Sequence, residues 1–265
     1  MGIAEDGDLL NLVRATVGRV GRRLSKRVED DAEAYSTSAE YPREVKSLVD
    51  EMVEREVLAA LSPTGISVLS EEAGFLKGAD DSDRCLIVDP LDGTYNYLHG
   101  LGPWAVSVAL WRNSSPTFGA VYSSADDAVF WGGPGLGAYR DDVPIVVSET
   151  SDRSRASICT GVPARVDIEA TLFRRHLWEL IDGFGKVRML GSAAISLVRV
   201  AAGAADAYCE DGIMIWDVAA GLAIVEGAGG RVVSHPGAVE NSVDVFASNG
   251  RLEGQTKTQG DTDGC

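Results

Sequence analysis

The fold is decided by the stretch Leu86-Ile87-Val88-Asp89-Pro90-Leu91-Asp92-Gly93-Thr94. Residues 85–88 are all apolar, which is typical of a strand buried on both faces of a sheet. Pro90 lacks the backbone N–H that a sheet ladder needs and is expected to end the strand, and Gly93 permits a sharp turn. Asp89 and Asp92 therefore come at the C-terminal end of a buried strand, where open α/β sheets keep their binding sites.

These two aspartates can face a single point, and the carbonyl oxygen of Leu91 can join them. Hard oxygen ligands gathered in this way suit Mg²⁺. Asp-Pro and Asp-Gly are also common turn dipeptides, so either aspartate alone would be interpreted as part of a turn. Because the whole string follows a buried strand, we interpret it as a metal site.

Four further acids, in three segments, each have a plain structural interpretation. Glu71 and Glu72 follow a short strand and are costly there unless a cation neutralises them, although Glu-Glu pairs are also common in solvated loops. Asp217 opens an apolar helix, where the helix dipole alone favours an acid. Asp50 can be an exposed helical acid that pairs with Lys46. Taken alone, each acid is better explained in that way. Their order along the chain and their neighbouring residues point to a shared functional site.

Apolar periodicity divides the chain into alternating helices and strands, which predicts layered α/β packing. A loop is expected over 29–44 and a hairpin turn, not a phosphate cradle, over the glycine-rich stretch 132–137. Helices are expected over 8–28, 45–61, 168–181, 193–201 and 216–226. In the second helix the positions expected to face inward are Val49, Met52, Val53, Val57 and Leu58. Strands are expected over 66–69, 85–88, 105–111, 117–122, 128–131, 156–159, 187–190, 207–209 and 231–234.

The 265 residues include 40 acidic and 24 basic side chains, a formal net charge of −16. A field of that sign repels nucleic acid, so no nucleic-acid partner is expected. It would also repel an acidic substrate unless metal ions intervene. No run of about eighteen apolar residues occurs, so no membrane span is expected. The acidic N-terminus lacks the basic and apolar parts of a signal peptide, and we expect a cytoplasmic protein.

Cysteines and histidines show no spacing typical of a zinc site, and scattered reduced thiols are expected instead. The histidines also lie apart from any Ser or Cys motif, so no catalytic role is assigned to them. The residues concerned are Cys85, Cys159, Cys209, Cys265, His99, His176 and His235.

The ordered motifs resemble those of the inositol monophosphatase superfamily, the Li⁺-sensitive, Mg²⁺-dependent phosphatases that include archaeal and bacterial fructose-1,6-bisphosphatase relatives. The resemblance runs from about residue 9 to residue 249. Its central motif is the string 89–97, and its second signature is 216–221 followed by 226–230. The acidic pair 71–72 and the segments 191–194 and 207–210 match the family's upstream acids and substrate-side segments.

The resemblance implies a layered αβαβα sandwich of the sugar-phosphatase type that hydrolyses a phosphate monoester on a small polyol or sugar, with two or three Mg²⁺ ions. The implied metal ligands are Glu71, Asp89, the Leu91 carbonyl, Asp92 and Asp217. The implied catalytic residues are Asp50, Glu71 and Thr94, with Thr94 orienting the attacking water and Asp50 as its acidic helper. The implied phosphate contacts are the N–H groups of Gly93 and Thr94, and the implied polyol contacts are Gly191, Ser192, Ala193 and Glu210.

The chain departs from the family pattern at two positions. Members usually carry Thr or Ser directly before the helix-start acid, whereas Val49 precedes Asp50 here. Tyr95 replaces a commoner Thr, a form associated with archaeal-type members.

Asp89 and Asp92 are three residues apart, whereas aspartyl-phosphate phosphatases carry Asp-x-Asp-Gly-Thr, so Asp89 is interpreted as a ligand and not as a nucleophile.

The resemblance leaves the substrate open. Inositol 1-phosphate is the first candidate and fructose 1,6-bisphosphate a close second, whose second phosphate Lys186 and Arg188 could contact if they are not simply a solvated strand edge. A 3′(2′),5′-bisphosphate nucleotidase is disfavoured, because Glu210 and the segment 95–97 resemble the inositol and fructose members more. A non-catalytic metal-binding relative is the alternative from another class. Two halves (1–150 and 151–265) and a lithium-sensitive homodimer are also expected.

Overall fold

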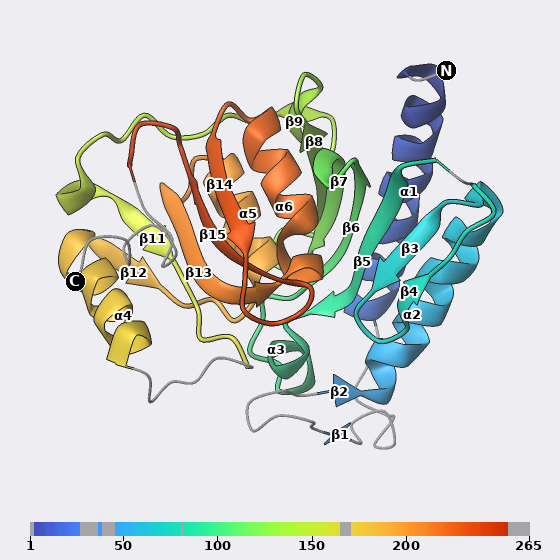
Figure 1. Cartoon of the computed structure of the whole chain (residues 1–265), viewed down its shortest axis with the longest axis horizontal. Helices are drawn as coiled ribbons and strands as arrows, with labels where there is room; N and C mark the ends of the chain where they lie inside the picture. The colour runs from blue at the N-terminus through green and yellow to red at the C-terminus, as the bar shows by residue number, and fades with distance from the viewer. Residues whose placement is uncertain (1–2, 27–36, 39–45, 81, 165–170, 254–265) are drawn as a thin grey trace.

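The structure, a computed structural model, describes residues 3–26, 37–38, 46–80, 82–164 and 171–253. Two helices, an eight-stranded sheet, two central helices, a five-stranded sheet and an outer helix follow one another across it (Figure 1). This is the αβαβα sandwich that the sequence predicts. Within the described residues, every helix is too short or too polar to cross a membrane.

The first layer consists of α1 (Ile3–Ser25) and α2 (Leu48–Leu61). Val13, Val17 and Val20 recur along α1 at helical spacing and are completely buried. They lie in one apolar cluster with residues of α2 and of the first sheet, so the two helices cover the outer face of that sheet.

The inner face of α2 is less apolar than its sequence pattern predicts. Met52, expected to face inward, is 40% exposed, and that prediction is wrong. Two acids, Asp50 and Glu54, are buried on this face instead. The inward positions that the structure confirms are Val49, Val53, Val57 and, partly buried, Leu58.

The first sheet is mixed and mostly antiparallel. Its strands are β3 (Ser67–Ser70), β4 (Gly74–Leu76), β5 (Arg84–Asp92), β6 (Ala105–Arg112), β7 (Ser115–Ser123), β8 (Ala128–Gly133), β9 (Gly137–Arg140) and β10 (Val143–Pro144). They lie in the order β10-β9-β8-β7-β6-β5-β3-β4, and only β3 and β5 pair in parallel. The glycine-rich stretch does form the hairpin turn expected between β8 and β9.

Strand β5 is buried on both faces, as its unbroken apolar run predicts. Leu86 and Val88 point to the cluster under α1 and α2, and Ile87 points to the cluster around the central helices. Pro90, however, does not end the strand, which continues to Asp92. The register with β6 shifts between Asp89 and Asp92, so the missing N–H of Pro90 is accommodated at a bulge.

The second sheet contains β11 (Ser157–Cys159), β12 (Lys186–Arg188), β13 (Ala207–Met214), β14 (Arg231–Pro236) and β15 (Ser242–Ser248), in the order β12-β11-β13-β15-β14. Helices α5 (Ala193–Ala201) and α6 (Ile215–Gly227) fill the space between the sheets, and α4 (Thr171–Gly183) covers the outer face (Figure 1). The strands of the first sheet all precede residue 150 and those of the second sheet all follow it. The division into halves at that position stays a prediction.

The sequence pattern misses several short elements. It does not predict β4, β10, β15 or the short helix α3 (Thr94–Leu98). The loop expected over 29–44 contains β1 (Thr37–Ser38), which pairs with β2 (Lys46–Ser47); the rest of it lies outside the described residues.

Gly119 of β7 lies directly against α6. A Cβ at this position would come within 2.3 Å of the Ala220 carbonyl oxygen and 2.5 Å of its Cα. Gly119→Ala must therefore push the helix away from the sheet, and we expect a loss of about 1–3 kcal/mol in the free energy of unfolding in urea. The control is Gly7→Ala on α1, where a Cβ meets nothing within 4 Å. Equal stability of the two variants would contradict this packing.

Candidate active site

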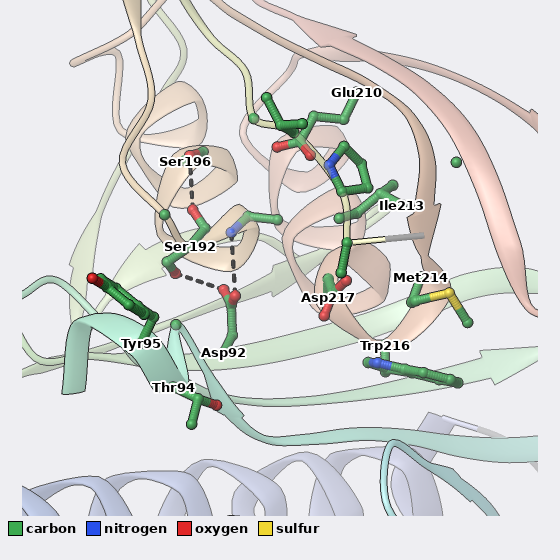
Figure 2. A pocket seen from close by; sticks show the side chains of 18 of the residues that line it. Asp92, Thr94, Tyr95, Ser192, Ser196, Glu210, Ile213, Met214, Trp216 and Asp217 are labelled. Carbon is green, nitrogen blue, oxygen red and sulfur yellow. Dashed lines mark hydrogen bonds between the residues drawn. The ribbon is translucent and has the colours of Figure 1, made fainter. Parts of the chain in front are cut away.

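The acids at the end of β5 meet an acid from the start of α6. Asp89, Asp92 and Asp217 each offer a carboxylate oxygen, and these oxygens all lie within 4.8 Å of one another. Figure 2 shows the carboxylates of Asp92 and Asp217 close to each other at the pocket. Asp89 is completely buried and Asp92 nearly so. The structure therefore brings together the acids of β5 and α6 that the family resemblance implies as metal ligands.

Asp89 has one satisfied and one unsatisfied carboxylate oxygen. Its Oδ1 accepts a 3.0 Å hydrogen bond from the Leu91 N–H. Its Oδ2 is buried and has no hydrogen-bond partner among the residues that the structure describes. Burial, followed by the charges of Glu71, Asp92 and Asp217, raises the pKa of Asp89 well above its ordinary value.

Such an arrangement of acids is costly by itself and fits a bound cation. A buried carboxylate oxygen without a partner is strongly unfavourable unless a proton or a positive charge compensates it. The donors gathered here are hard carboxylate oxygens, which are the ligands that Mg²⁺ prefers. The residues present therefore fit the metal that the sequence implies.

Asp92 is held by the N-terminus of α5. Its carboxylate accepts hydrogen bonds from the Ser192 hydroxyl at 2.6 Å and from the N–H groups of Ala194 at 2.7 Å and Ala193 at 3.3 Å. Burial raises the pKa of Asp92 to about 6, while these hydrogen bonds lower it. Ser192 and Ala193, expected to contact the polyol, thus donate these hydrogen bonds to Asp92, although both still line the pocket with Gly191.

Asp50 and the pocket-lining Thr94 form a second polar group. The Thr94 hydroxyl lies 2.9 Å from Asp50 Oδ1 and 3.0 Å from the Leu91 carbonyl oxygen, and can donate to either. Asp50 Oδ2 accepts from both the N–H and the hydroxyl of Ser47, each at 2.7 Å. Burial raises the pKa of Asp50, against the lowering effect of the hydrogen bonds from Ser47 and Thr94.

The Ser47 contact explains how Asp50 is positioned although Val49 replaces the usual hydroxyl residue. Ser47 is the N-cap of α2 and Asp50 the third residue of the helix, a capping box. The signal was present in the sequence as Ser-x-x-Asp, and sequence reasoning missed it. Asp50 is therefore a buried, oriented acid and not the exposed one that its helix position alone suggests.

Glu71 faces the acid cluster from the turn after β3. Burial first, and then the charges of Asp217, Glu72 and Asp50, raise its pKa well above the ordinary value. The turn is anchored by Glu54, whose Oε1 accepts from the Ser70 hydroxyl at 2.5 Å and from the N–H groups of Ala73 at 3.0 Å and Glu72 at 3.2 Å. Glu54 is a positioning residue that sequence reasoning missed.

Glu210 lies on β13 at the opposite side of the pocket (Figure 2). Burial and the charge of Asp217 raise its pKa to about 8. Gly161, which no sequence signal identifies, packs so closely that a Cβ there would come within 2.5 Å of Glu210 Oε1. The absence of a side chain at residue 161 therefore leaves room for the Glu210 carboxylate.

These residues surround a cavity of about 260 Å³. None of the described residues that line it is a lysine or an arginine, and Lys186 and Arg188 lie on the exposed edge strand β12 instead. Asp50, Asp89 and Leu91 lie outside the lining. The predicted site residues that line it are Glu71, Asp92, Gly93, Thr94, Gly191, Ser192, Ala193, Glu210 and Asp217. Lining residues that sequence reasoning missed are Thr160, Gly161, Val162, Pro163, Ala164, Ser196, Gly212, Ile213 and Met214.

The raised pKa values predict an unusual pH dependence for the metal-free protein. The pKa of Asp92 rises from 3.8 to about 6 and that of Glu210 from 4.5 to about 8 on folding. The folded chain thus binds more protons than the unfolded chain, and the free energy of unfolding falls as the pH rises. The stabilisation that the protonated Asp92 and Glu210 give the folded chain is complete below about pH 4. It is lost as the pH rises through about 6 for Asp92 and about 8 for Glu210.

Thermal unfolding in EDTA across this pH range measures the effect. We expect the melting temperature to fall with rising pH, and excess Mg²⁺ to flatten the curve by supplying the missing positive charge. Glu210→Gln is the matched variant, because it removes only the step near pH 8. A metal-free melting temperature that rises with pH, or a Glu210→Gln curve identical to that of the parent, would contradict the assignment.

Comparison with known proteins gives one consistent family. The model of the inositol monophosphatase family matches residues 8–261. The chain is 35% identical over 226 residues to an inositol-1-monophosphatase of Mesorhizobium japonicum, which covers 84% of each chain. It is 35% identical over 200 residues to a fructose-1,6-bisphosphatase/inositol-1-monophosphatase of Aquifex aeolicus, covering 75% of this chain and 74% of the relative.

Solved structures agree with this result. The inositol monophosphatase of Anabaena superposes with a TM-score of 0.78 at 32% identity, over 93% of this chain and 92% of the other. The extragenic suppressor protein suhB of Bartonella henselae superposes with a TM-score of 0.80 at 30% identity, over 92% and 95%. With the family model matching almost the whole length, the chain belongs to the inositol monophosphatase family, whose members are phosphatases.

Proposed function

We propose that the chain catalyses the Mg²⁺-dependent hydrolysis of a phosphate monoester on a small polyol or sugar, with inositol 1-phosphate as the first candidate. The observation that carries the proposal is the buried Asp89 Oδ2, which has no partner among the described residues and lies within a cluster of hard oxygen ligands. The names of the Mesorhizobium and Anabaena proteins support the choice of substrate.

The proposed Mg²⁺ ligands are carboxylates from three elements and one carbonyl oxygen. When bound, two or three Mg²⁺ ions supply the positive charge that draws a phosphate dianion into an acidic pocket and stabilises the charge that develops on the leaving oxygen. The ligands would be Glu71, Asp89, the Leu91 carbonyl, Asp92 and Asp217.

Thr94 and Asp50 are proposed to activate the attacking water. When the Thr94 hydroxyl donates its proton to Asp50 Oδ1, 2.9 Å away, an oxygen lone pair remains free to accept a hydrogen bond from a water in the pocket. Asp50 can then take up the proton that the water loses, relayed through the hydroxyl. Ser47 keeps the other oxygen of Asp50 fixed during this transfer.

Phosphate and polyol are proposed to bind at opposite sides of the cavity. Gly93, with a φ of +91°, turns the chain so that the N-terminus of α3 begins at Thr94, beside the acid cluster. The first N–H groups of a helix have no partner within it, so those of Gly93 and Thr94 can donate to phosphate oxygens. Glu210 can accept hydrogen bonds from substrate hydroxyls at the far side.

The lining favours a monophosphate over a bisphosphate. With no lysine or arginine among the described lining residues, a second phosphate would find no protein cation in the cavity. Fructose 1,6-bisphosphate remains the second candidate substrate, because the Aquifex relative carries both activities in its name. A non-catalytic role is not supported, since every acid proposed as a metal ligand, catalytic residue or substrate contact is present and is buried or lines the pocket.

The test is phosphate release from inositol 1-phosphate, fructose 1,6-bisphosphate and adenosine 3′,5′-bisphosphate at saturating Mg²⁺. We expect inositol 1-phosphate to have the highest kcat/KM. A higher value for either bisphosphate would overturn the choice of substrate while leaving the reaction class intact. No release from any of the three would support the non-catalytic alternative.

We further propose a cytoplasmic homodimer that Li⁺ inhibits, as the family resemblance implies. Size-exclusion chromatography with light scattering measures the assembly, and phosphate release in the presence of LiCl measures the inhibition. A monomer, or turnover indifferent to LiCl, would remove the corresponding part of this proposal.

Gly161→Ala should weaken substrate binding by displacing the Glu210 carboxylate. A hydrogen bond to a charged group contributes about 1.5–3 kcal/mol, so we expect KM for inositol 1-phosphate to rise roughly tenfold or more, with a smaller change in kcat. Ser154→Ala, a change in an exposed turn, is the control. Glu210→Gln should raise KM as well, and an unchanged KM in both variants would remove Glu210 from the substrate site.

A further inference from the structure

A second group of metal-ligating side chains lies behind the active site. Along β13 successive side chains point to opposite faces of the sheet, so Glu210 faces the cavity while Cys209 packs in the apolar cluster under α4. Asp211 follows Cys209 by two residues and lies close to His176 of α4. His176, Cys209 and Asp211 form one of the two groups of potential metal ligands found among the described residues, and the other is the Asp89 cluster.

The geometry of this group matches a four-coordinate metal. His176 Nε2 lies 3.4 Å from Cys209 Sγ and 3.8 Å from Asp211 Oδ2, and all three ligand atoms lie within 4.8 Å of one another. Around tetrahedral Zn²⁺, metal–ligand bonds of about 2.0–2.3 Å place neighbouring ligand atoms roughly 3.4–3.6 Å apart. Only small movements of the side chains would therefore complete the coordination.

The surroundings also favour a cation. The Glu179 carboxylate lies 3.9 Å from His176 Nδ1 and adds a negative charge beside the group. The Glu179 and Asp211 carboxylates thus supply negative charge that a bound cation would offset.

We propose that His176, Cys209 and Asp211 form a second metal site, for a thiophilic divalent cation such as Zn²⁺, on the face of β13 opposite the active-site cavity. One thiolate, one imidazole and one carboxylate are a donor set suited to Zn²⁺ and not to Mg²⁺, which prefers oxygen ligands alone. The His176 side chain is 20% exposed, whereas Cys209 and Asp211 are buried. The sequence concealed the site, since His176 and Cys209 are 33 residues apart.

The competing interpretation is an imidazole–thiol hydrogen bond with no metal function. Co²⁺ distinguishes the two, because it replaces Zn²⁺ in such sites and gives a near-ultraviolet charge-transfer band only when a thiolate coordinates it. The oxygen-only ligands of the Asp89 cluster cannot produce that band. The titration is made with the full chain in a Cys265→Ser background, so that the C-terminal thiol does not contribute.

We expect one Co²⁺ per chain to give the thiolate band and one equivalent of Zn²⁺ to abolish it. His176→Gln, on a partly exposed helix position, should weaken Co²⁺ binding at least tenfold with an unchanged circular dichroism spectrum. Cys209→Ser should remove the band, whereas the control Cys85→Ser should retain it. Absence of the band in the unaltered site, or its persistence in Cys209→Ser, would overturn the proposal in favour of the hydrogen bond alone.

Discussion

Asp89→Asn is expected to lower Mg²⁺-dependent phosphate release by about three orders of magnitude or more. The substitution removes the charge of a fully buried carboxylate whose Oδ2 has no hydrogen-bond partner among the described residues. Loss of metal ions that contribute several kcal/mol of transition-state stabilisation corresponds to a factor of this size.

The stability of the same variant provides the control, because it should change in opposite directions with and without metal. In EDTA, Asp89→Asn relieves the repulsion from Glu71, Asp92 and Asp217, and its melting temperature should exceed that of the unaltered chain. In excess Mg²⁺ the order should reverse, since the variant has lost a ligand. Substantial activity in the variant, or the same order under both conditions, would contradict the assignment of Asp89 as a metal ligand.

Removing the Thr94–Asp50 pair should have the second largest effect. Asp50→Asn and Thr94→Val should each lower kcat by about 10²–10⁴, the usual contribution of a positioned proton acceptor, with little change in KM. Because the two side chains act through one hydrogen bond of 2.9 Å, the double variant should lose scarcely more activity than either single one.

Ser47→Ala separates this effect from a merely structural one. It removes the cap of α2 and one hydrogen bond to Asp50, at a cost of about 1 kcal/mol in stability, but leaves the Thr94 contact in place. We expect it to retain most of kcat. Additive losses in the double variant, or a kcat in Ser47→Ala as low as in Asp50→Asn, would show that Asp50 only supports the fold.

The sequence identifies the acid cluster because the string 86–94 joins a buried strand to two carboxylates and a glycine turn. This pattern is local in the sequence and can be identified without knowledge of tertiary contacts, and the structure does bring Asp89, Asp92 and Asp217 together. The continuation of β5 past Pro90 could not be predicted. A bulge opposite β6 accommodates the missing N–H, and the pairing with that partner strand sets the register.

The supporting residues could not be predicted, because their partners are distant in the chain. Glu54 binds a turn 16–19 residues away, and the amide of Asn96 donates to the carbonyl oxygens of Pro103 and Leu190, the latter 94 residues away. Gly161 gains its role only from the close approach of Glu210. A single sequence shows which residues could bind a metal, but the packing of two sheets decides which neighbours orient them.

The most direct test of the central claim is an anomalous diffraction map from crystals soaked in Mn²⁺, which shares the preference of Mg²⁺ for carboxylate oxygen. The account predicts at least one strong peak within coordination distance of Asp89, Asp92 and Asp217, and its loss in Asp89→Asn crystals. A map with no peak at this cluster, from crystals that hold Mn²⁺ elsewhere, would contradict it.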